Sequence, residues 1–313
     1  MICLITILFF AWYFFGSVSK NRTANTFIIP QNKIGFNLIE NLYKEGFIKN
    51  KKASQFLYTF IFNGFEIQDG GYYLSSASFT WDIFKKLELK KPDLVWININ
   101  FCPRKEQIGE ILKNNLNWTE SDLNIWNSLY KETDYFEGVY YPDTYLIPVN
   151  EKPENVASRF INRFNEKFAI YQNKFLEKNI KWTTGLKIAS LIGKEAGGTE
   201  DSKIVSSVIW NRLDKGMKLQ IDATMQYTLG KNENGKWWGP ISLEEKQSDS
   251  TYNTYRFPGL PPTPICSPNI NFIEAALNPE ETDCLYYLHD EKRQIHCSST
   301  YEEHKENIGL YLQ

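Results

Sequence analysis

The sequence is poor in the residues from which metal and disulfide sites are built. It has 3 histidines and 5 cysteines in 313 residues. The histidines lack metal-ligand spacing such as H-E-x-x-H, so we expect no metal site, and nothing in the sequence calls for a cofactor. The cysteines are too few and too irregularly spaced for a disulfide framework, although Cys266, Cys284 and Cys297 can supply one bridge.

Long basic runs are also absent. The formal net charge of −2 gives no electrostatic attraction to nucleic acid or to an anionic membrane surface, so we expect no nucleic-acid partner. Apolar residues make up 42% of the chain, enough for a sizeable core and room for roughly two domains of about 100 to 200 residues. Aromatic residues make up 15%, which suits a core and also surfaces that stack on sugar rings.

Charge is missing from residues 2–18, a run rich in Leu, Ile and Phe. Its length is at the lower limit of the about 17 to 25 residues that span a bilayer, so residues 1–20 are predicted to be a membrane anchor. A cleaved signal peptide is the alternative, because Ser17-Val18-Ser19 offers a small-x-small site, but the basic n-region is missing. Lys20 and Arg22 follow the segment and favour a cytoplasmic location for that side. A start codon assigned too late would explain this orientation.

Residues 21–150 repeat a short strand followed by a helix, which indicates a small α+β module of a binding or spacing type. Strands are predicted near residues 27–29, 72–74 and 95–99. Helical spacing of apolar residues follows each strand. The positions concerned are Ile34, Leu38, Ile39 and Leu42, then Trp81, Phe84 and Leu87, then Ile108, Ile111 and Leu112.

Residues 151–313 are predicted to form a second, mainly helical domain. Val156, Phe160, Phe164 and Phe168 keep i+4 spacing in a helix over about 154–168. A later amphipathic helix spans about 204–213 and carries the polar Asn211 on its apolar stripe. The fold class is therefore α+β, with an anchor, a small βα module and a mainly helical domain.

Glu195 is the leading catalytic candidate. It lies seven, four and three residues after Ile188, Leu191 and Ile192, so it shares their apolar helical face. A glutamate there must be paired or stay protonated, and a protonated glutamate near neutral pH can act as a general acid. The alternative is a solvent-exposed glutamate at a helix end before the Gly197-Gly198 pair.

Several separate motifs in one order resemble the endolytic murein transglycosylases of the YceG-like, or MltG-type, family. They are the 136–148 segment, the Glu195 helix, Asn211-Arg212, Gln220 to Thr224, Tyr252-Asn253-Thr254-Tyr255 with Gly259 to Pro262, and Ser299 to His304. The resemblance covers nearly the whole chain. It implies that residues 21–150 are LysM-like and that residues 151–313 form the catalytic domain.

The resemblance implies a single-pass plasma-membrane protein, held by its N-terminal helix, whose catalytic domain is extracytoplasmic. Its substrate would be nascent peptidoglycan glycan strands, and penicillin-binding proteins of the elongation machinery would be its partners. Glu195 would protonate the glycosidic oxygen between MurNAc and GlcNAc, then take the proton from the C6 hydroxyl as it closes onto C1. A 1,6-anhydro end results, and one carboxyl serves as acid and then base.

Substrate-binding candidates come from the same motifs. They are Glu137, Asn211, Gln220, Tyr252, Asn253 and Tyr255. A structural role in ordering loops is the alternative for each of them. The chain departs from the family pattern at Gly193, where many members have a second glutamate, at Ala223 in place of proline, and at Thr263 in place of glycine.

Two other functions stay open at this point. One is a membrane-anchored peptidoglycan-binding protein without activity, in which Glu195 is structural. The other is a muramidase that adds water and uses a second carboxylate such as Glu137.

Overall fold

The structure is a computed structural model that describes residues 12–20, 22–100 and 102–312. It divides into two compact units. The first contains the described residues up to 98 together with 114–117 and 144–151, and the second contains the described residues of 99–113, 118–143 and 152–313. Residues 99–113 and 118–143, which the sequence analysis placed in the small module, thus pack within the second unit.

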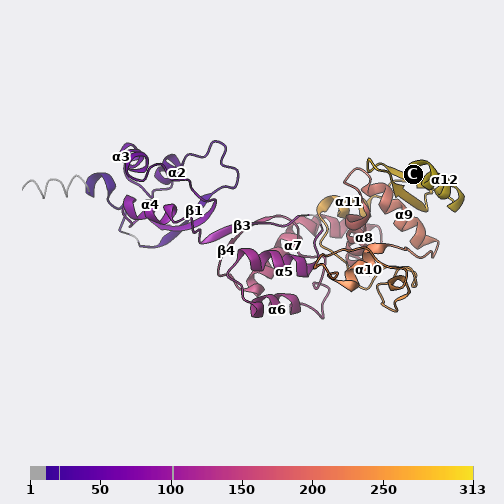
Figure 1. The fold of residues 1–313 in the computed structure, drawn as a ribbon. Coiled ribbons are helices and arrows are strands. Elements are labelled where there is room, and N and C mark those ends of the chain that lie inside the picture. The colour runs from indigo at the N-terminus through magenta and orange to yellow at the C-terminus, as the bar shows by residue number, and fades with distance from the viewer. Residues whose placement is uncertain (1–11, 21, 101, 313) are drawn as a thin grey trace, which may run out of the picture. The chain divides into compact units, whose positions relative to one another are not determined.

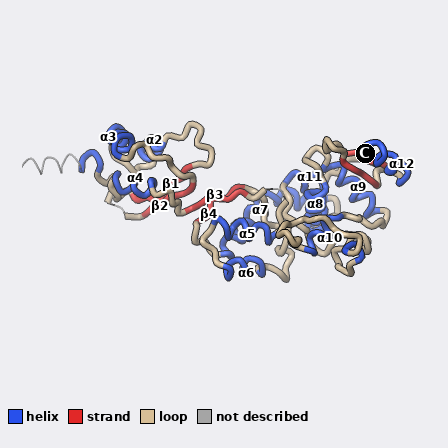
Figure 2. Tube along the Cα trace, viewed as in Figure 1, coloured by secondary structure: helices blue, strands red, loops and turns tan. Residues whose placement is uncertain are grey.

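The first unit is built on a four-stranded antiparallel sheet with the order β1-β2-β3-β4 (Figure 2). The strands are β1 (Ala24–Ile29), β2 (Gly70–Ser75), β3 (Leu94–Asn98) and β4 (Thr144–Pro148). Strand β2 meets β3 at Gly71, where a Cβ atom would lie 2.8 Å from the Leu94 side chain. Glycine at position 71 therefore lets the two strands approach.

The helices of this unit are α2 (Leu38–Lys44), α3 (Lys51–Phe56), the π-helical turn η1 (Leu57–Ile61) and α4 (Thr80–Glu88). Asn37 and Asn50 cap α2 and α3 by accepting backbone N–H bonds. The predicted strand–helix alternation is present, but α3 was not predicted. Ile34 was predicted to be an apolar helix position, which is wrong: α2 begins after the Asn37 cap, and Ile34 is 90% exposed.

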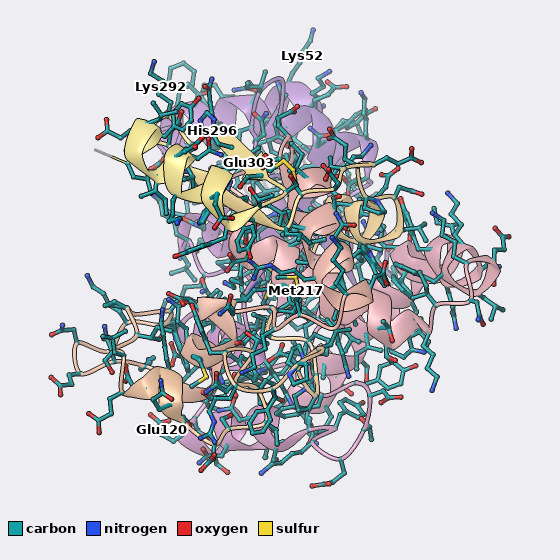
Figure 3. All side chains as sticks on the ribbon, turned by 90° about the vertical axis from the view of Figure 1, so that its right-hand side faces the viewer. Lys52, Glu120, Met217, Lys292, His296 and Glu303 are labelled. Atoms are coloured by element: carbon teal, nitrogen blue, oxygen red, sulfur yellow. A yellow bond between two sulfur atoms is a disulfide. The ribbon has the colours of Figure 1, made fainter. Side chains whose placement is uncertain are left out.

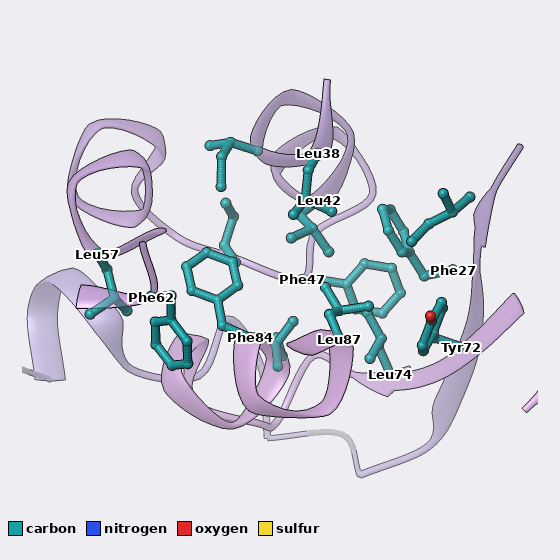
Figure 4. Packing of buried hydrophobic residues seen from close by; sticks show 14 residues of the cluster. Phe27, Leu38, Leu42, Phe47, Leu57, Phe62, Tyr72, Leu74, Phe84 and Leu87 are labelled. Carbon is teal, nitrogen blue, oxygen red and sulfur yellow. The ribbon is translucent and has the colours of Figure 1, made fainter. Parts of the chain in front are cut away.

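The core of the first unit lies between the sheet and these helices (Figure 4). Phe27 of β1 packs on Phe47 with their ring centroids 5.7 Å apart. Phe62 packs on Phe84 of α4 in the same way at 5.6 Å. The predicted positions Leu42, Phe84 and Leu87 are fully buried.

The second unit is mainly helical. Its elements are α5 (Lys105–Asn115), α6 (Glu120–Ser128), α7 (Pro153–Glu177), α8 (Trp182–Glu195), α9 (Ser202–Asp214), α10 (Asp222–Leu229), the 3-10 turn η2 (Glu245–Gln247), α11 (Ile270–Leu277), the hairpin β5 (Tyr286–His289) and β6 (Ile295–Ser298), and α12 (Tyr301–Tyr311). Helix α8 contacts α7, α9, α10 and α11, so it is central to the unit (Figure 1). Its last residue is Glu195.

Helix α7 is the longest described helix, and the predicted i+4 phenylalanine pattern is confirmed there. Val156, Phe160, Phe164 and Phe168 are all buried, and the apolar stripe continues beyond the predicted end through Tyr171 and Phe175. Pro153 occupies the first turn, where its missing N–H costs nothing.

Four cysteines form two disulfides, Cys102–Cys266 and Cys284–Cys297. The expectation that the cysteines build no disulfide framework is therefore wrong. The first bridge joins residues 164 positions apart, a pairing that spacing in the sequence does not reveal. Both bridges lie within the second unit.

Residues 1–11 of the predicted membrane anchor lie outside the described residues. Among the helices that the structure does describe, none has both the length and the apolar character needed to cross a membrane.

Phe84→Ala is expected to lower the free energy of unfolding of the first unit by about 3 to 5 kcal/mol, because it leaves a cavity in a fully packed core. Denaturant unfolding followed by circular dichroism measures this loss. Phe60→Ala is the matched control, since Phe60 is 67% exposed and its removal should cost about 0.5 kcal/mol. Equal losses in both variants would contradict the described packing.

Candidate active site

Glu195 ends helix α8 because the next residues cannot continue it. Ala196 is extended, and the backbone N–H groups of Gly197 and Gly198 turn to the Asp201 carboxylate at 2.8 and 3.0 Å. The apolar residues that share its helical face, Ile188 among them, are fully buried, while Glu195 itself is half-buried. The carboxylate thus lies at the boundary between the core and solvent.

Tyr287 of β5 donates its hydroxyl to Glu195 Oε2 at 2.5 Å. Burial raises the pKa of Glu195 above its ordinary value of 4.5, and the nearby charge of Asp222 raises it further. The Tyr287 hydrogen bond is the largest opposing effect, because it stabilises the carboxylate form. Burial also raises the pKa of Tyr287 well above 10, so the tyrosine keeps its proton at neutral pH.

A cavity of about 340 Å³ opens at the Glu195 carboxylate. Its volume falls in the range of about 300 to 1,000 Å³ that is typical of small-molecule sites. The other lining residues come from α9, the segment before α10, the 252–255 loop, β5 and α12. They are Val208, Ile209, Arg212, Leu219, Gln220, Ile221, Tyr255, Tyr286, Tyr287, Tyr301 and His304.

Gln220, one of the predicted binding residues, enters this cavity from a strained backbone. Its φ of 55° lies in the left-handed region, which costs a non-glycine residue about 1 to 3 kcal/mol. The Thr254 loop holds it there: Gln220 N donates to Thr254 O at 3.1 Å, and Ile221 N donates to Thr254 Oγ1 at 2.9 Å. The Tyr-Asn-Thr-Tyr loop therefore fixes one wall of the cavity.

Tyr255, also predicted, lines the cavity and belongs to a small charged group. Its hydroxyl donates to Asp222 Oδ1 and accepts from Lys246 Nζ at 3.1 Å. Lys246 also pairs with Asp222 at 3.1 Å. The structure thus brings Glu195, Gln220 and Tyr255 together at one cavity.

Asn253 and Tyr252 are placed outside the cavity lining. Asn253 is fully buried, and its Nδ2 donates to the carbonyls of Lys246 at 3.0 Å and Ser248 at 2.7 Å. The Tyr252 hydroxyl lies 2.7 Å from Thr263 Oγ1, so the unusual threonine at position 263 contributes a contact that glycine cannot. Both residues order the loop that carries Tyr255.

Asn211 is also placed elsewhere. Its Nδ2 donates to Thr282 O at 2.8 Å and Cys284 O at 3.0 Å, so it ties α9 to the segment that leads into β5. It lines a second cavity of about 680 Å³, with Trp210 and Lys178. Its polar group on the apolar stripe is explained by these two carbonyls.

Glu137 is buried away from the Glu195 cavity, at 1% exposure. It accepts backbone N–H bonds from Lys105 at 3.2 Å and Gly138 at 3.1 Å, and the Tyr227 hydroxyl at 3.3 Å. Burial, helped by the charge of Glu106, raises the pKa of Glu137 to about 7.

Position 193, where the family pattern led us to expect a second glutamate, has little room for a side chain. A Cβ atom at position 193 would lie 2.6 Å from Cys102 Sγ and 3.2 Å from the Phe272 ring. The Cys102–Cys266 disulfide therefore packs against the helix face where many relatives are expected to carry a side chain. Cys266 Sγ also lies 3.2 Å from Ser190 O, so the bridge contacts α8 at a second place.

The sequence analysis missed Tyr287, which no motif or helical spacing relates to Glu195 across 92 residues. It also left Arg212 without a defined partner. Arg212 donates to Leu285 O and to Leu219 O, each at 2.6 Å, and so joins the residue just before β5 to the loop before Gln220. The motif that contains His304 was noted, but its place in the cavity was not.

The C-terminal hairpin and α12 complete the cavity wall. His296 of β6 stacks on Tyr311 of α12 with centroids 3.6 Å apart, and Glu303 caps the first turn of α12 with Thr300. Figure 3 labels His296 and Glu303 close to the yellow ribbon of the C-terminal part. On the cavity side, His304 stacks on Tyr286 at 5.4 Å. Burial lowers the pKa of His304, so the ring is neutral at pH 7.

Tyr287→Phe is expected to raise the pKa of Glu195 further, because a charge-assisted hydrogen bond worth about 1.5 to 3 kcal/mol is lost from the carboxylate. NMR titration of ¹³C-labelled glutamate side chains, assigned with Glu195→Gln, measures it. Tyr286→Phe is the control, since that neighbouring cavity tyrosine makes no bond to Glu195 in the described structure. An unchanged pKa in Tyr287→Phe would contradict the geometry.

Glu137→Gln is expected to flatten the pH dependence of stability. The folded-state pKa of about 7 lies above the ordinary 4.5, so the folded protein binds the extra proton and wild-type stability falls as pH rises between these values. The fall due to Glu137 is about 3 kcal/mol. Denaturant unfolding near pH 4.5 and near pH 7 measures the change in the free energy of unfolding for each protein. Glu132→Gln, which replaces an exposed glutamate, is the control. Wild-type and Glu137→Gln proteins that lose the same free energy between these pH values would refute the prediction.

Comparison with known proteins identifies the family of the chain. The YceG-like family model matches residues 27–309. Proteins named endolytic murein transglycosylase from Streptococcus pneumoniae R6 and Bacillus subtilis 168 are each 32% identical over 182 and 179 residues, 56% of this chain. The chain matches 32% and 48% of their lengths.

A crystal structure of a YceG-like protein from Listeria monocytogenes superposes with a TM-score of 0.61 at 28% identity. It covers 91% of this chain and 99% of its own. Because the family model covers most of the sequence and the solved structure shares the fold, the chain belongs to the YceG-like family.

Proposed function

We propose that the protein is an endolytic lytic transglycosylase of peptidoglycan, with Glu195 as its acid and base. The observation that carries the proposal is a half-buried carboxyl with a raised pKa at the wall of a sugar-sized cavity. Its relatives in two bacteria bear the name endolytic murein transglycosylase. We take murein, the substrate in the relatives' names, as the substrate of this protein.

The cavity favours a transglycosylase over a water-using muramidase. Glycosidases that add water use two carboxylates on either side of the bond, about 5 to 9.5 Å apart. Among the described lining residues, Glu195 is the one carboxylate, and Glu137 is enclosed elsewhere by its own hydrogen bonds. A reaction that replaces water by the C6 hydroxyl of the substrate needs a single acid and base.

Glu195 can perform both proton transfers in turn. Its raised pKa retains the proton that the glycosidic oxygen between MurNAc and GlcNAc must receive. Once that proton has left, the Tyr287 hydroxyl stabilises the carboxylate, which then takes the proton of the C6 hydroxyl. The product is a 1,6-anhydro-MurNAc end.

The side chains around the Glu195 carboxyl are proposed to bind the sugar. Gln220 and Arg212 bring polar groups to the cavity, and Tyr255, Tyr286 and Tyr301 bring ring faces. Such a mixture of aromatic faces with a few polar groups is typical of ligand sites. Asn211, Tyr252, Asn253 and Glu137 are proposed to support these residues through the contacts described above.

The rest of the chain is proposed to serve the same substrate. Residues 21–150 would be a LysM-like glycan-binding module, which the antiparallel pair β1 and β2 with two intervening helices supports. Residues 151–313 would carry catalysis, together with residues 99–113 and 118–143, which pack in the second unit.

The location proposed is the plasma membrane, with residues 1–20 as a single-pass anchor and the catalytic domain outside the cytoplasm. Disulfides persist in oxidising compartments, and the second unit has two. Action on nascent strands would place penicillin-binding proteins of the elongation machinery among its partners.

Digestion of purified peptidoglycan with mass spectrometry of the products tests the proposal. Wild type is expected to release anhydro-MurNAc ends, and Glu195→Gln to lose at least about 100-fold in rate because the proton donor is gone. Glu200→Gln, an exposed glutamate five residues on, is the matched control and should keep the wild-type rate.

Each other outcome has a defined meaning. Reducing ends would indicate a hydrolase, and equal rates in wild type and Glu195→Gln would remove Glu195 from the chemistry. Absence of products from wild type would favour a peptidoglycan-binding protein without activity.

A further inference from the structure

Lys194 precedes Glu195 on α8 but faces a different group of residues. Consecutive helix side chains diverge by about 100° around the axis. Glu195 meets Tyr287 in the cavity, whereas the Lys194 ammonium lies over the Trp238 ring, 3.7 Å from its centroid. Lys194 does not line the Glu195 cavity.

The Lys194 ammonium has no hydrogen-bond acceptor among the described residues. The carboxylate whose charge acts on the pKa of Lys194 is Glu137, and the Glu137 oxygens already accept hydrogen bonds from Lys105, Gly138 and Tyr227. Arg104, the neighbouring cation, donates to Glu106 at 2.6 Å and to Tyr227 O at 2.7 Å. Lys194 therefore keeps three N–H donors available in a half-buried place.

This arrangement leaves the Lys194 ammonium able to bind an acceptor. The charge lies over the face of Trp238, a cation–π contact that uses none of its N–H donors. Burial lowers the pKa of Lys194 to about 8, so it remains mostly charged at neutral pH. An anionic ligand would accept charge-assisted hydrogen bonds from these donors.

Trp238 and its neighbour Trp237 are each hydrogen-bonded to α5. Trp238 Nε1 donates to Gln107 Oε1 at 2.8 Å, and Trp237 Nε1 donates to Glu110 Oε2 at 3.1 Å. Trp238 has a φ of 62°, a left-handed conformation that is unusual for a bulky residue. Strain of this kind is maintained where a side chain must be aimed, and both rings are half-buried with area left to solvent.

We propose that Lys194 and Trp238 form a second subsite that binds a carboxylate carried by the glycan strand, with the ring face of Trp238 beside it. The proposal rests on the proposed function, because it takes peptidoglycan as the ligand. The carboxylate has two sources, the peptide stem and the free lactyl group of a strand without stems. Since Lys194 adjoins Glu195, the subsite lies within a few sugars of the bond to be cleaved.

Binding measurements on the full chain with the Glu195→Gln substitution test the subsite on intact strands. Calorimetry compares three ligands: strands with peptide stems, strands freed of stems by an amidase, and the neutral GlcNAc hexamer. Adding Lys194→Gln is expected to weaken binding of a carboxylate-bearing strand about 10-fold or more, the loss expected for one charge-assisted hydrogen bond. Binding of the neutral hexamer should not change.

Lys194→Arg keeps the charge and should retain most of the binding, which separates an ionic role from a packing role. The strand type that responds identifies the source of the carboxylate. Thermal unfolding of each variant checks that the fold persists. Trp238→Ala should weaken all three ligands, because it removes a ring face that neutral and charged sugars share.

Equal weakening of all ligands by Lys194→Gln, no weakening, or no binding of any glycan would each overturn the subsite. The readout is separate from cleavage. If wild type binds strands in this pattern but releases no anhydro ends, the proposed activity fails and the subsite stands.

Discussion

The hydrogen bond from Tyr287 to Glu195 is the interaction on which the candidate site depends. It joins the C-terminal end of α8 to the β5–β6 hairpin, two elements that share no local sequence relation. Asp201 reinforces this junction, because it accepts from Gly197 and Gly198 behind Glu195 and also pairs with His289 of β5 at 2.5 Å. Helix end and hairpin are thus fixed to each other twice, and the cavity forms where they meet.

The two disulfides fall on these same elements. Cys297 lies opposite Tyr287 in the hairpin register, and its bridge to Cys284 fixes the segment from which β5 starts. The Cys102–Cys266 bridge packs against Gly193 and contacts Ser190 O, so it supports α8 near the end that carries Glu195. Covalent links are therefore concentrated where a displacement of about 1 Å would change proton transfer most.

Sequence reasoning succeeded where the signal is local and failed where it depends on tertiary contacts. The i+4 phenylalanines of α7 and the apolar face that ends in Glu195 follow from helical periodicity alone. Helix α3 has little apolar periodicity, and its one buried residue, Ser54, is polar. The sequence of α3 therefore gave no signal of a helix. The position of Tyr287 and the pairing in the Cys102–Cys266 disulfide depend on contacts between residues far apart in the sequence. Asn253 and Tyr255 belong to the same loop motif, but the folded loop buries Asn253 and places Tyr255 in the cavity lining.

A raised pKa does not by itself identify the acid, as a comparison of Glu137 with Glu195 shows. Burial raises the pKa of both Glu137 and Glu195. Glu137 is surrounded by two backbone N–H groups and a tyrosine hydroxyl, and it is not among the described residues that line the Glu195 cavity. Glu195 has one donor and an open side. A proton must leave its carboxyl and return, so access to the substrate, together with a partner that stabilises the anion, distinguishes the catalytic candidate from the structural one.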